Sequence, residues 1–273
     1  MANLKGRTLV ITGGSRGIGR EVALRAAKDG ANVAILAKTA EPHPKLPGTI
    51  FTVAKEVDEA GGHGLGVQTD VRDEENVKKA IEQVVEKFGG IDVLINNAGA
   101  ISVTPTEMTS MKRYDLMHDI NVRGPFLMTR TCLPHLEKSK FGHVVNYSPP
   151  VAVEERWLGG HAAYTTSKFA MSMLAVGMAG EFREKNISVN ALWPRTLIAT
   201  AAIEMLMGDD GMKNSRSPAI MADATYELLL TENLEVTGQM LIDEDFLRTR
   251  GYTDFETYKN HPDGEPMKDL YID

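Results

Sequence analysis

Leu9-Val10-Ile11-Thr12-Gly13-Gly14-Ser15-Arg16-Gly17-Ile18-Gly19 is the stretch that decides the fold of this chain. Its first four residues are apolar or β-branched and predict a buried strand, and the residues from Ile18 onward follow a helical pattern. Between them, the glycines permit a tight turn and a close approach of the backbone to a ligand. The free N–H groups and the positive end of the helix suit a pyrophosphate. The stretch therefore predicts a phosphate-binding loop.

Short strand-like runs and helical patterns alternate along the rest of the chain. This alternation predicts a parallel sheet with helices on both faces, a Rossmann-type, doubly wound α/β fold of about seven strands. We expect one domain over residues 1–250 and a C-terminal extension over 251–273, where the pattern weakens. The expected strands are 8–12, 32–37, 64–69, 92–96, 143–148, 187–192 and 239–243, and the expected helices are 18–29, 74–88, 111–136, 164–185 and 219–230.

Two segments predict irregular structure. Residues 41–47 contain three prolines and are expected to form an extended loop directly after the second strand. Residues 261–266 contain two prolines and a glycine, and we expect the tail around them to pack as a surface extension on the edge of the domain.

The composition excludes several classes of protein. The chain has 30 Lys and Arg against 37 Asp and Glu, and its net charge of -7 disfavours binding to nucleic acid or to an anionic membrane. The single cysteine, Cys132, excludes an internal disulfide and fits a reducing compartment. No Cys/His pair has metal-ligand spacing, and no run predicts a signal peptide or a membrane span. We therefore expect a cytoplasmic protein without a bound metal.

Four motifs follow one another along the first two hundred residues. They are Thr12-Gly-x3-Gly-Ile-Gly19, Asn96-Asn-Ala-Gly99, Asn121-Val-Arg-Gly-Pro-Phe126 and Tyr164-Thr-Thr-Ser-Lys168. Together they resemble the motifs of the short-chain dehydrogenases/reductases. The resemblance implies an oxidoreductase that uses a nicotinamide dinucleotide. It also implies a homodimer or homotetramer built through the helices expected at 111–136 and 164–185, and it leaves the choice between these two assemblies open.

Four further segments, 37–49, 146–150, 190–194 and 221–224, resemble one subgroup of that family. The larger members of the subgroup carry a C-terminal sterol-carrier domain. This chain ends before such a domain can begin, so we expect no lipid transfer of that kind.

The residues after the second expected strand bear on the choice of cofactor. An NAD enzyme places a carboxylate there to hold the ribose hydroxyls, and this chain has Ala37 at that position. Lys38 follows it, and Lys38 and Arg16 are cations suited to the 2′-phosphate of NADP(H). Lys45 is a third candidate, and the alternative for Lys38 is an ordinary solvated lysine. We therefore expect NADP(H) rather than NAD(H).

Further cofactor contacts are implied by the resemblance alone. Asp70 and Val71 would border the adenine, Asn97 and Ala98 would line the adenosine ribose, and Pro194 would lie on the carboxamide side of the nicotinamide. The family places a glycine after that proline, whereas this chain has Arg195, which leaves the geometry of the turn open.

Tyr164 and Lys168 are the candidate acid–base pair. Residues four apart lie on one face of a helix, with about 5–6 Å between their Cβ atoms. A phenol titrates near about 10, and a neighbouring ammonium and an oxidised nicotinamide would favour its ionised form. We predict that Tyr164 moves a proton to or from the substrate oxygen. By resemblance, Lys168 also binds the nicotinamide ribose. The alternative is an exposed helix pair without a function.

Asn121 and Ser148 complete the candidate catalytic set. By resemblance, Asn121 would anchor a water near the lysine; the alternative is an amide that only satisfies backbone groups. The family places a serine three residues after the asparagine of the fifth strand, a position that Pro149 occupies here. The nearest hydroxyl, Ser148, comes one residue early and would point to the opposite face of a continuing strand. Whether Ser148 takes part in the chemistry stays open.

The segment after Pro194 bears on the substrate. It carries apolar residues, among them Ile198, Ile203 and Met205, in a region that is a mobile lid in the family. We expect an oxidoreductase that interconverts a carbonyl and an alcohol on a small apolar substrate; the bland alternative for this segment is a packed helix. The rival function is a weakly active or inactive NADP-binding sensor or scaffold. The physiological substrate and the direction of the reaction stay open.

Overall fold

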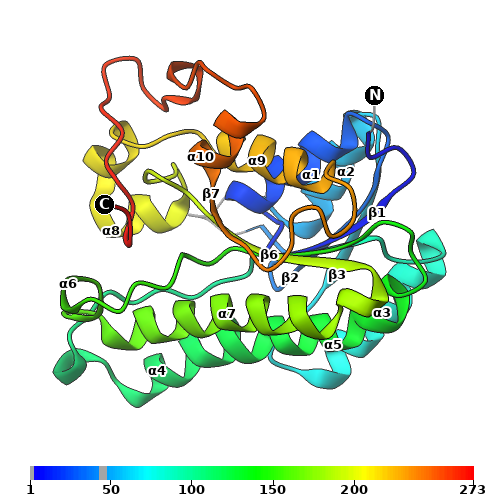
Figure 1. Cartoon of the computed structure of the whole chain (residues 1–273), viewed down its shortest axis with the longest axis horizontal. Helices are drawn as coiled ribbons and strands as arrows, with labels where there is room; N and C mark the ends of the chain where they lie inside the picture. The colour runs from blue at the N-terminus through cyan, green and yellow to red at the C-terminus, as the bar shows by residue number, and fades with distance from the viewer. Residues whose placement is uncertain (1–2, 43–47) are drawn as a thin grey trace.

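Seven parallel strands form the centre of the protein, in the order β3-β2-β1-β4-β5-β6-β7 (Figure 1). The structure is a computed structural model that describes residues 3–42 and 48–273. It confirms the prediction of a Rossmann-type, doubly wound α/β fold, and each expected strand end lies within two residues of the observed one. The strands are β1 (Thr8–Thr12), β2 (Asn32–Ala37), β3 (His63–Gln68), β4 (Val93–Asn96), β5 (Gly142–Asn146), β6 (Ile187–Trp193) and β7 (Met240–Ile242).

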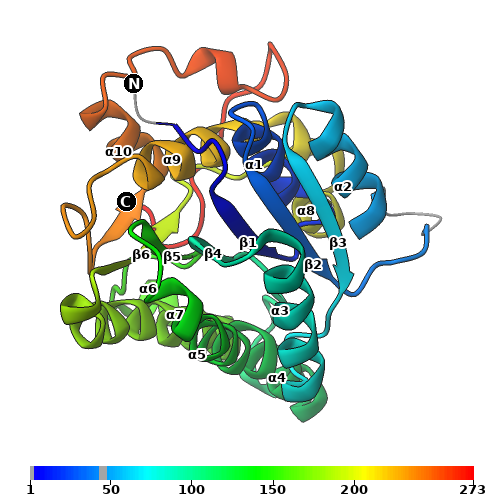
Figure 2. The same ribbon diagram turned by 90° about the vertical axis from the view of Figure 1, so that its right-hand side faces the viewer.

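Two layers of helices enclose the sheet, as Figure 2 shows. Helices α1, α2, α9 and α10 cover one face, and α3, α4, α5 and α7 lie on the other. The helices are α1 (Gly17–Ala27), α2 (Ile50–Glu59), α3 (Glu74–Phe88), α4 (Met111–His118), α5 (Gly124–Leu136), α6 (Glu155–Leu158), α7 (Ala162–Glu181), α8 (Ala201–Lys213), α9 (Ala219–Leu229) and α10 (Asp243–Thr249). Among the residues with described coordinates, no helix is long and apolar enough to cross a membrane.

The strand β1 shows why an apolar run produces this layered core. All five of its residues are buried, and successive side chains point to opposite faces of a strand. Leu9 and Ile11 accordingly belong to the core under α1 and α9, whereas Val10 belongs to the core under α3 and α5. A strand buried on both faces has no polar side to alternate with, which explains its continuous apolar sequence.

Several elements differ from the expectation. The helix expected over 111–136 is divided into α4 and α5 by a π-helical turn, η2 (Asp119–Arg123). Helices α2, α6 and α10 were not expected at all. The proline-rich loop expected over 41–47, which includes Lys45, lies outside the described residues from position 43 onward.

The order of the strands fixes the place of the ligand crevice. The chain winds from β1 outward to β2 and β3, then returns to β4 on the other side of β1. The loops that follow β1 and β4 therefore leave the sheet in opposite directions at its carboxyl edge. In open parallel sheets this switch point opens the crevice in which ligands bind.

Candidate active site

The glycine-rich loop connects β1 to α1 in a conformation that only glycine adopts easily. Gly13 has φ 66° and Gly17 has φ 56°. A Cβ atom on Gly13 would lie 2.9 Å from the Cα of Ala98, and one on Gly19 would lie 2.6 Å from the amide nitrogen of Asn97. Arg16 is the N-cap of α1, and no side chain of the described residues caps this helix end. Its first N–H groups are thus available to an anion.

Asn97 holds the glycine loop against the end of β4. Its amide nitrogen donates to the carbonyl oxygens of Thr12 at 2.8 Å and Gly13 at 3.0 Å. In return, the hydroxyl of Thr12 accepts hydrogen bonds from the backbone N–H groups of Asn97 and Ala98, both at 3.0 Å. These bonds join the two strand ends that form the switch point and keep the loop in one shape.

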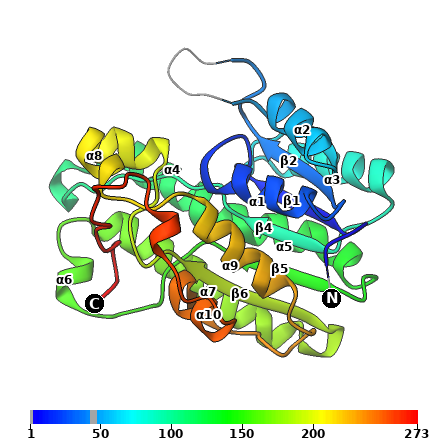
Figure 3. The ribbon, with the colours of Figure 1, turned by 90° about the horizontal axis from the view of Figure 1, so that it is seen from above.

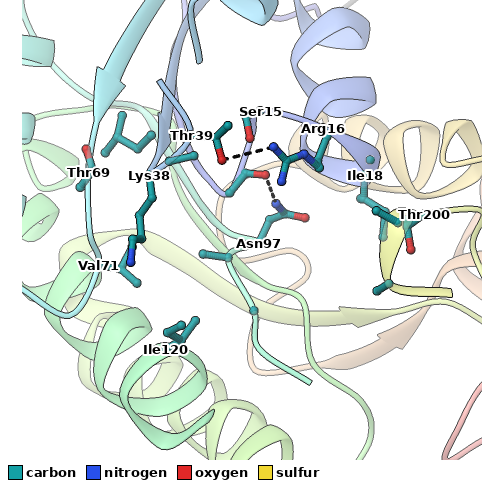
Figure 4. A pocket seen from close by; sticks show the side chains of 18 of the residues that line it. Ser15, Arg16, Ile18, Lys38, Thr39, Thr69, Val71, Asn97, Ile120 and Thr200 are labelled. Atoms are coloured by element: carbon teal, nitrogen blue, oxygen red, sulfur yellow. Dashed lines mark hydrogen bonds between the residues drawn. The ribbon is translucent and has the colours of Figure 1, made fainter. Parts of the chain in front are cut away.

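A cavity of about 470 Å³ lies beside this loop. It receives residues from the ends of β1, β2, β3 and β4, and Figure 4 shows their side chains around it. Gly14 and Gly19 are absent from this lining within the described chain and instead pack inside the loop. The predicted cofactor residues that line the cavity are Gly13, Ser15, Arg16, Gly17, Ile18, Lys38, Asp70, Val71, Asn97 and Ala98.

Two cations stand in the lining of this cavity. The Lys38 side chain is 64% exposed, and its nitrogen lies 3.4 Å from a carboxylate oxygen of Asp70. Arg16 donates to the hydroxyl of Thr39 at 3.2 Å (Figure 4) and to the carbonyl of Gly48 at 3.3 Å. A hydrogen bond from Arg72 is the main cause that holds the pKa of Asp70 well below its usual range, so this carboxylate stays ionised.

A second cavity, of about 240 Å³, continues from the first. Five residues line both cavities: Ile18, Asn97, Gly99, Thr200 and Ala202. The second cavity contains Tyr164 and Lys168 from α7 and Pro194 from the end of β6. Ile198 and Ile203 of the apolar segment also line it, whereas Met205 lines the first cavity.

Tyr164 and Lys168 are both buried, with 6% and 7% exposed. The Lys168 nitrogen donates to the carbonyl oxygen of Tyr147 at 2.5 Å and lies 5.0 Å from the centre of the Trp193 ring. Burial lowers the pKa of Lys168 to about 8, and the charge of Asp269 opposes that shift. The Tyr164 pKa is raised well above its ordinary value, mainly by burial. This direction is opposite to the expected one, because burial disfavours the phenolate.

Asn121 lies in the π-helical turn and is fully buried. Its oxygen accepts from the N–H of Ala100 at 2.8 Å, and its nitrogen donates to the carbonyl of Ala100 at 2.9 Å and to the hydroxyl of Ser167 at 3.0 Å. The side chain therefore ties the loop after β4 to α7, one residue before Lys168. The predicted water beside the lysine stays a prediction.

The end of β5 separates Ser148 from the cavity. The strand stops at Asn146, and among the described residues it is Tyr147, and not Ser148, that lines the second cavity. The Ser148 hydroxyl is buried and has no hydrogen-bond partner in the described part of the chain. The one-residue offset noted in the sequence thus places the hydroxyl outside the lining, and the arrangement gives no support to a catalytic role for it.

The turn after Pro194 is held by acidic residues of α10. The backbone N–H of Arg195 donates to Asp243 at 2.8 Å, and the Arg195 guanidinium pairs with Asp245. A carboxylate contact from a distant helix thus supports the turn in which the family uses a glycine. Burial raises the pKa of Asp243 to about 6.

Asp269, which lies in the tail, lines the second cavity beside Tyr164 and Lys168, and the sequence did not predict this. No local pattern around Asp269 indicates a site, because the chain returns to the cavity more than seventy residues after β6.

A doubly wound parallel sheet with a glycine loop at its switch point is the architecture of the Rossmann-type nucleotide-binding proteins. Residues 7–207 match the model of the short chain dehydrogenase family. The chain belongs to this family.

Both a related protein and a solved short-chain dehydrogenase structure are similar to this chain over almost its whole length. It is 52% identical over 270 residues to "Hydroxysteroid dehydrogenase-like protein 2" of Danio rerio, an alignment that covers 99% of this chain and 65% of the relative. The chain thus spans about two-thirds of that relative's length. The crystal structure of a short chain dehydrogenase from Mycobacterium thermoresistibile superposes with a TM-score of 0.94 at 46% identity and covers 99% of this chain and 96% of its own.

Two more distant structures contain dinucleotides. A metagenomic short-chain oxidoreductase in complex with NADP has a TM-score of 0.73 at 25% identity and covers 88% of this chain and 98% of its own. An NADH-dependent reductase complexed with NAD has a TM-score of 0.70 at 27% identity and covers 88% of this chain and 95% of its own. Similar folds thus accept either dinucleotide, and the choice depends on the residues around the cavity.

Proposed function

We propose that this protein is an NADP(H)-dependent oxidoreductase that interconverts a carbonyl and an alcohol on a small, largely apolar substrate. The observation that carries the proposal is the continuity of the two cavities. Tyr164 and Lys168 line the smaller one, the glycine loop lines the larger one, and five residues line both. A dinucleotide extended from the loop would therefore bring its reactive end to the tyrosine.

The choice of NADP(H) is supported by the residues around the larger cavity. Arg16 and Lys38 line it, and Ala37 stands where an NAD enzyme carries a carboxylate. Cations at this place suit a phosphate and not a pair of ribose hydroxyls. The uncapped N-terminus of α1, described above, fits the pyrophosphate of the same cofactor.

The chemistry would divide between the cofactor and two side chains. When bound, NADP(H) supplies or accepts the hydride. In the reducing direction, the protonated Tyr164 hydroxyl donates its proton to the substrate oxygen, and in the oxidising direction the phenolate accepts it. A protonated Lys168 would offset the negative charge on that phenolate, and Asn121 fixes the loop against which α7 packs. Ser148 stays a candidate for the catalytic set, and the Ser148→Ala variant tests it.

An oligomer through α4, α5 and α7 is part of the proposal. Large apolar side chains on these helices are exposed to solvent, including Met111, Phe126, Met173 and Val176. All three helices lie on the same side of the sheet (Figure 1). Exposed apolar side chains that gather on one face favour an interface between subunits.

Tyr164→Phe tests the proposal, because it removes the proton-transferring oxygen and little else. We expect the variant to lose more than about a hundredfold in NADPH-dependent turnover while it binds NADPH as the wild type does. A panel of aldehydes, ketones and their alcohols identifies the activity, and Tyr114→Phe on the surface of α4 is the matched control. A wild type that binds NADPH but turns over no member of the panel would instead favour a sensor or scaffold.

A further inference from the structure

The last residues of the chain return to the carboxyl edge of the sheet and form part of the smaller cavity. The carbonyl of Met267 accepts from the N–H of Leu197 at 2.9 Å, and the N–H of Asp269 donates to the carbonyl of Arg195 at 3.1 Å. Between these bonds, Lys268 forms an antiparallel bridge with Thr196. Figure 3 shows the segment passing between α8 and α6 to the end of the chain. The tail is thus fixed along the turn that follows β6.

Tyr271 fixes the end of this segment against α7. Its ring is 5% exposed and lies among aromatic rings, with centres 5.0 Å from Phe169 and 6.0 Å from both Trp157 and Trp193. Its hydroxyl lies 3.0 Å from that of Thr165, the neighbour of Tyr164. The indole N–H of Trp193 donates to the carbonyl of Leu270 at 3.0 Å. Contacts on both sides of Asp269 therefore hold this residue in place.

The carboxylate of Asp269 has one oxygen without a partner. Oδ1 accepts from the N–H of Leu270 at 2.6 Å, whereas no residue of the described chain donates a hydrogen bond to Oδ2. Among the described residues, Asp269 is the only carboxylate in the lining of the smaller cavity, most of whose other members are apolar. Asp269 is partly exposed in this cavity, so a ligand that supplies a donor can reach the second oxygen there.

Charged and titratable groups surround Asp269 on three sides. Lys168 and Tyr164 face it from α7, Asp243 lies at the start of α10, and Tyr271 follows it in the tail. Lys168 gives its hydrogen bond to Tyr147 and not to Asp269. The carboxylate therefore lies beside Tyr164 and Lys168, and the Lys168 nitrogen does not donate a hydrogen bond to it.

We propose that Asp269 binds the substrate, and that its free oxygen accepts a hydrogen bond from a hydroxyl or amino group on a carbon near the reacting one. The substrate class is then hydroxy- or amino-substituted ketones and the corresponding diols or amino alcohols. The remainder of such a molecule would lie against Ile198 and Ile203. This inference rests on the proposed function, since it concerns the substrate of the same site.

The test compares matched pairs of ligands that differ by a single group. Hydroxyacetone and butan-2-one have the same number of heavy atoms, with a hydroxyl in one where the other has a methyl group. A second pair, 1-hydroxyhexan-2-one and heptan-3-one, extends the chain. Binding to the NADPH-loaded Tyr164→Phe protein is measured by saturation-transfer NMR, and kcat/KM is measured with the wild type. The binding readout does not need turnover.

At about pH 8, where the Asp269 carboxylate is ionised, we expect the hydroxyketone to be preferred by at least about tenfold in both readouts, the effect of one hydrogen bond to a charged acceptor. Asp269→Ala should reduce the preference, measured as the ratio of the two ligands within the variant, to within about twofold. Glu265→Gln, which removes the same charge from an exposed position in the tail, should keep the preference of the wild type. Asp269→Asn keeps the shape of the side chain. Its unfolding temperature shows whether the tail stays docked when the charge is absent.

Two outcomes overturn the inference. One is an equal preference in kcat/KM for the wild type and Asp269→Ala, and the other is an NADPH-loaded Tyr164→Phe protein that does not distinguish the members of either pair in binding. A failure of the proposed function looks different: no Tyr164-dependent hydride transfer occurs with any ligand, whatever the binding preference.

Discussion

The ammonium nitrogen of Lys38 lies 3.4 Å from a carboxylate oxygen of Asp70 in the lining of the larger cavity. Arg72 holds the same carboxylate at 2.6 Å, so Asp70 is shared between two cations. Lys38 is the more exposed of the two. A phosphate group that enters this part of the cavity would compete with Asp70 for Lys38. Arg72 already neutralises the charge of Asp70.

The first prediction follows from this arrangement. NADPH should bind at least about tenfold more tightly than NADH, because a charge-assisted contact contributes about 1.5–3 kcal/mol. Lys38→Asp should remove or reverse the preference, since it places a carboxylate where the ribose hydroxyls of NADH would lie. Calorimetry at a single ionic strength gives both dissociation constants, and Lys55→Asp, an exposed change on α2, is the control. Equal constants for the two dinucleotides in the wild type would contradict the prediction.

The second prediction concerns the hydrogen bonds by which the Asn97 side chain holds the glycine loop. A methyl group at Gly19 would lie 2.6 Å from the amide nitrogen of Asn97 and 2.9 Å from the Cα of Gly14. Gly19→Ala should displace Asn97 and break its two bonds to the loop. Two hydrogen bonds of ordinary strength correspond to at least about a tenfold rise in the Kd for NADPH. Gly90→Ala, where the new methyl group has open space, should change that Kd little. Unchanged affinity in Gly19→Ala would show that Asn97 does not shape the phosphate site.

The third prediction addresses the hydroxyl at the end of β5. Because the Ser148 oxygen is buried outside the cavity lining, we expect Ser148→Ala to lower kcat/KM less than about tenfold. A group that stabilises the developing charge on a carbonyl oxygen is worth about 100-fold to 1,000-fold. A loss of that size, measured on the substrate that Tyr164→Phe fails to turn over, would place Ser148 in the catalytic set.

The fourth prediction is a dependence of stability on pH. Burial raises the pKa of Asp269 to about 7, whereas an unfolded aspartate titrates near about 3.9. Between these values the folded chain holds a proton that the unfolded chain releases, so this group lowers the free energy of unfolding as pH rises. Asp269→Asn removes the effect. Its free energy of unfolding, relative to the wild type, should therefore increase from about pH 5 to about pH 8 in urea titrations.

The Glu265→Gln variant provides the comparison for that measurement, because Glu265 is exposed. Its difference from the wild type should stay constant over the same range of pH. If Asp269→Asn also gave a constant difference, the carboxyl would have the same affinity for protons in the folded and unfolded states.

The parts of the fold that the sequence predicted depend on local patterns. The strand-turn-helix from Thr8 to Ala27 follows from an apolar run, the glycines and a helical period. The pairing of Tyr164 with Lys168 in one cavity follows from their spacing on a helix, because residues four apart share a face. Neither inference requires knowledge of a distant segment.

Helix α2 was missed although its signals are present. Thr49 accepts a hydrogen bond from the N–H of Thr52, and the Thr52 hydroxyl accepts one from the N–H of Thr49, which is a capping box. Ile50, Val53 and Val57 are buried on one face at helical spacing. The prolines just before Thr49 predict a loop, and the helical pattern begins directly after them.

The position of Asp269 could not be predicted in this way. It depends on backbone bonds from the tail to Arg195 and Leu197, which join segments about seventy residues apart. The position of Ser148 was open for a related reason, because the exact residue at which β5 ends decides which side chain reaches the cavity. Both depend on tertiary contacts and not on local preference.

The docking of the tail also places part of the smaller cavity far along the sequence from the glycine loop. The glycine loop and Asn97 lie before residue 100, whereas Met267, Leu270 and Tyr271 contact Leu197, Trp193 and Thr165. Tyr271 is buried among other aromatic rings, so a library of variants in the tail would have to retain this residue. Variation at Asp269 alone would alter the wall of the smaller cavity without any change in the sequence of the glycine loop.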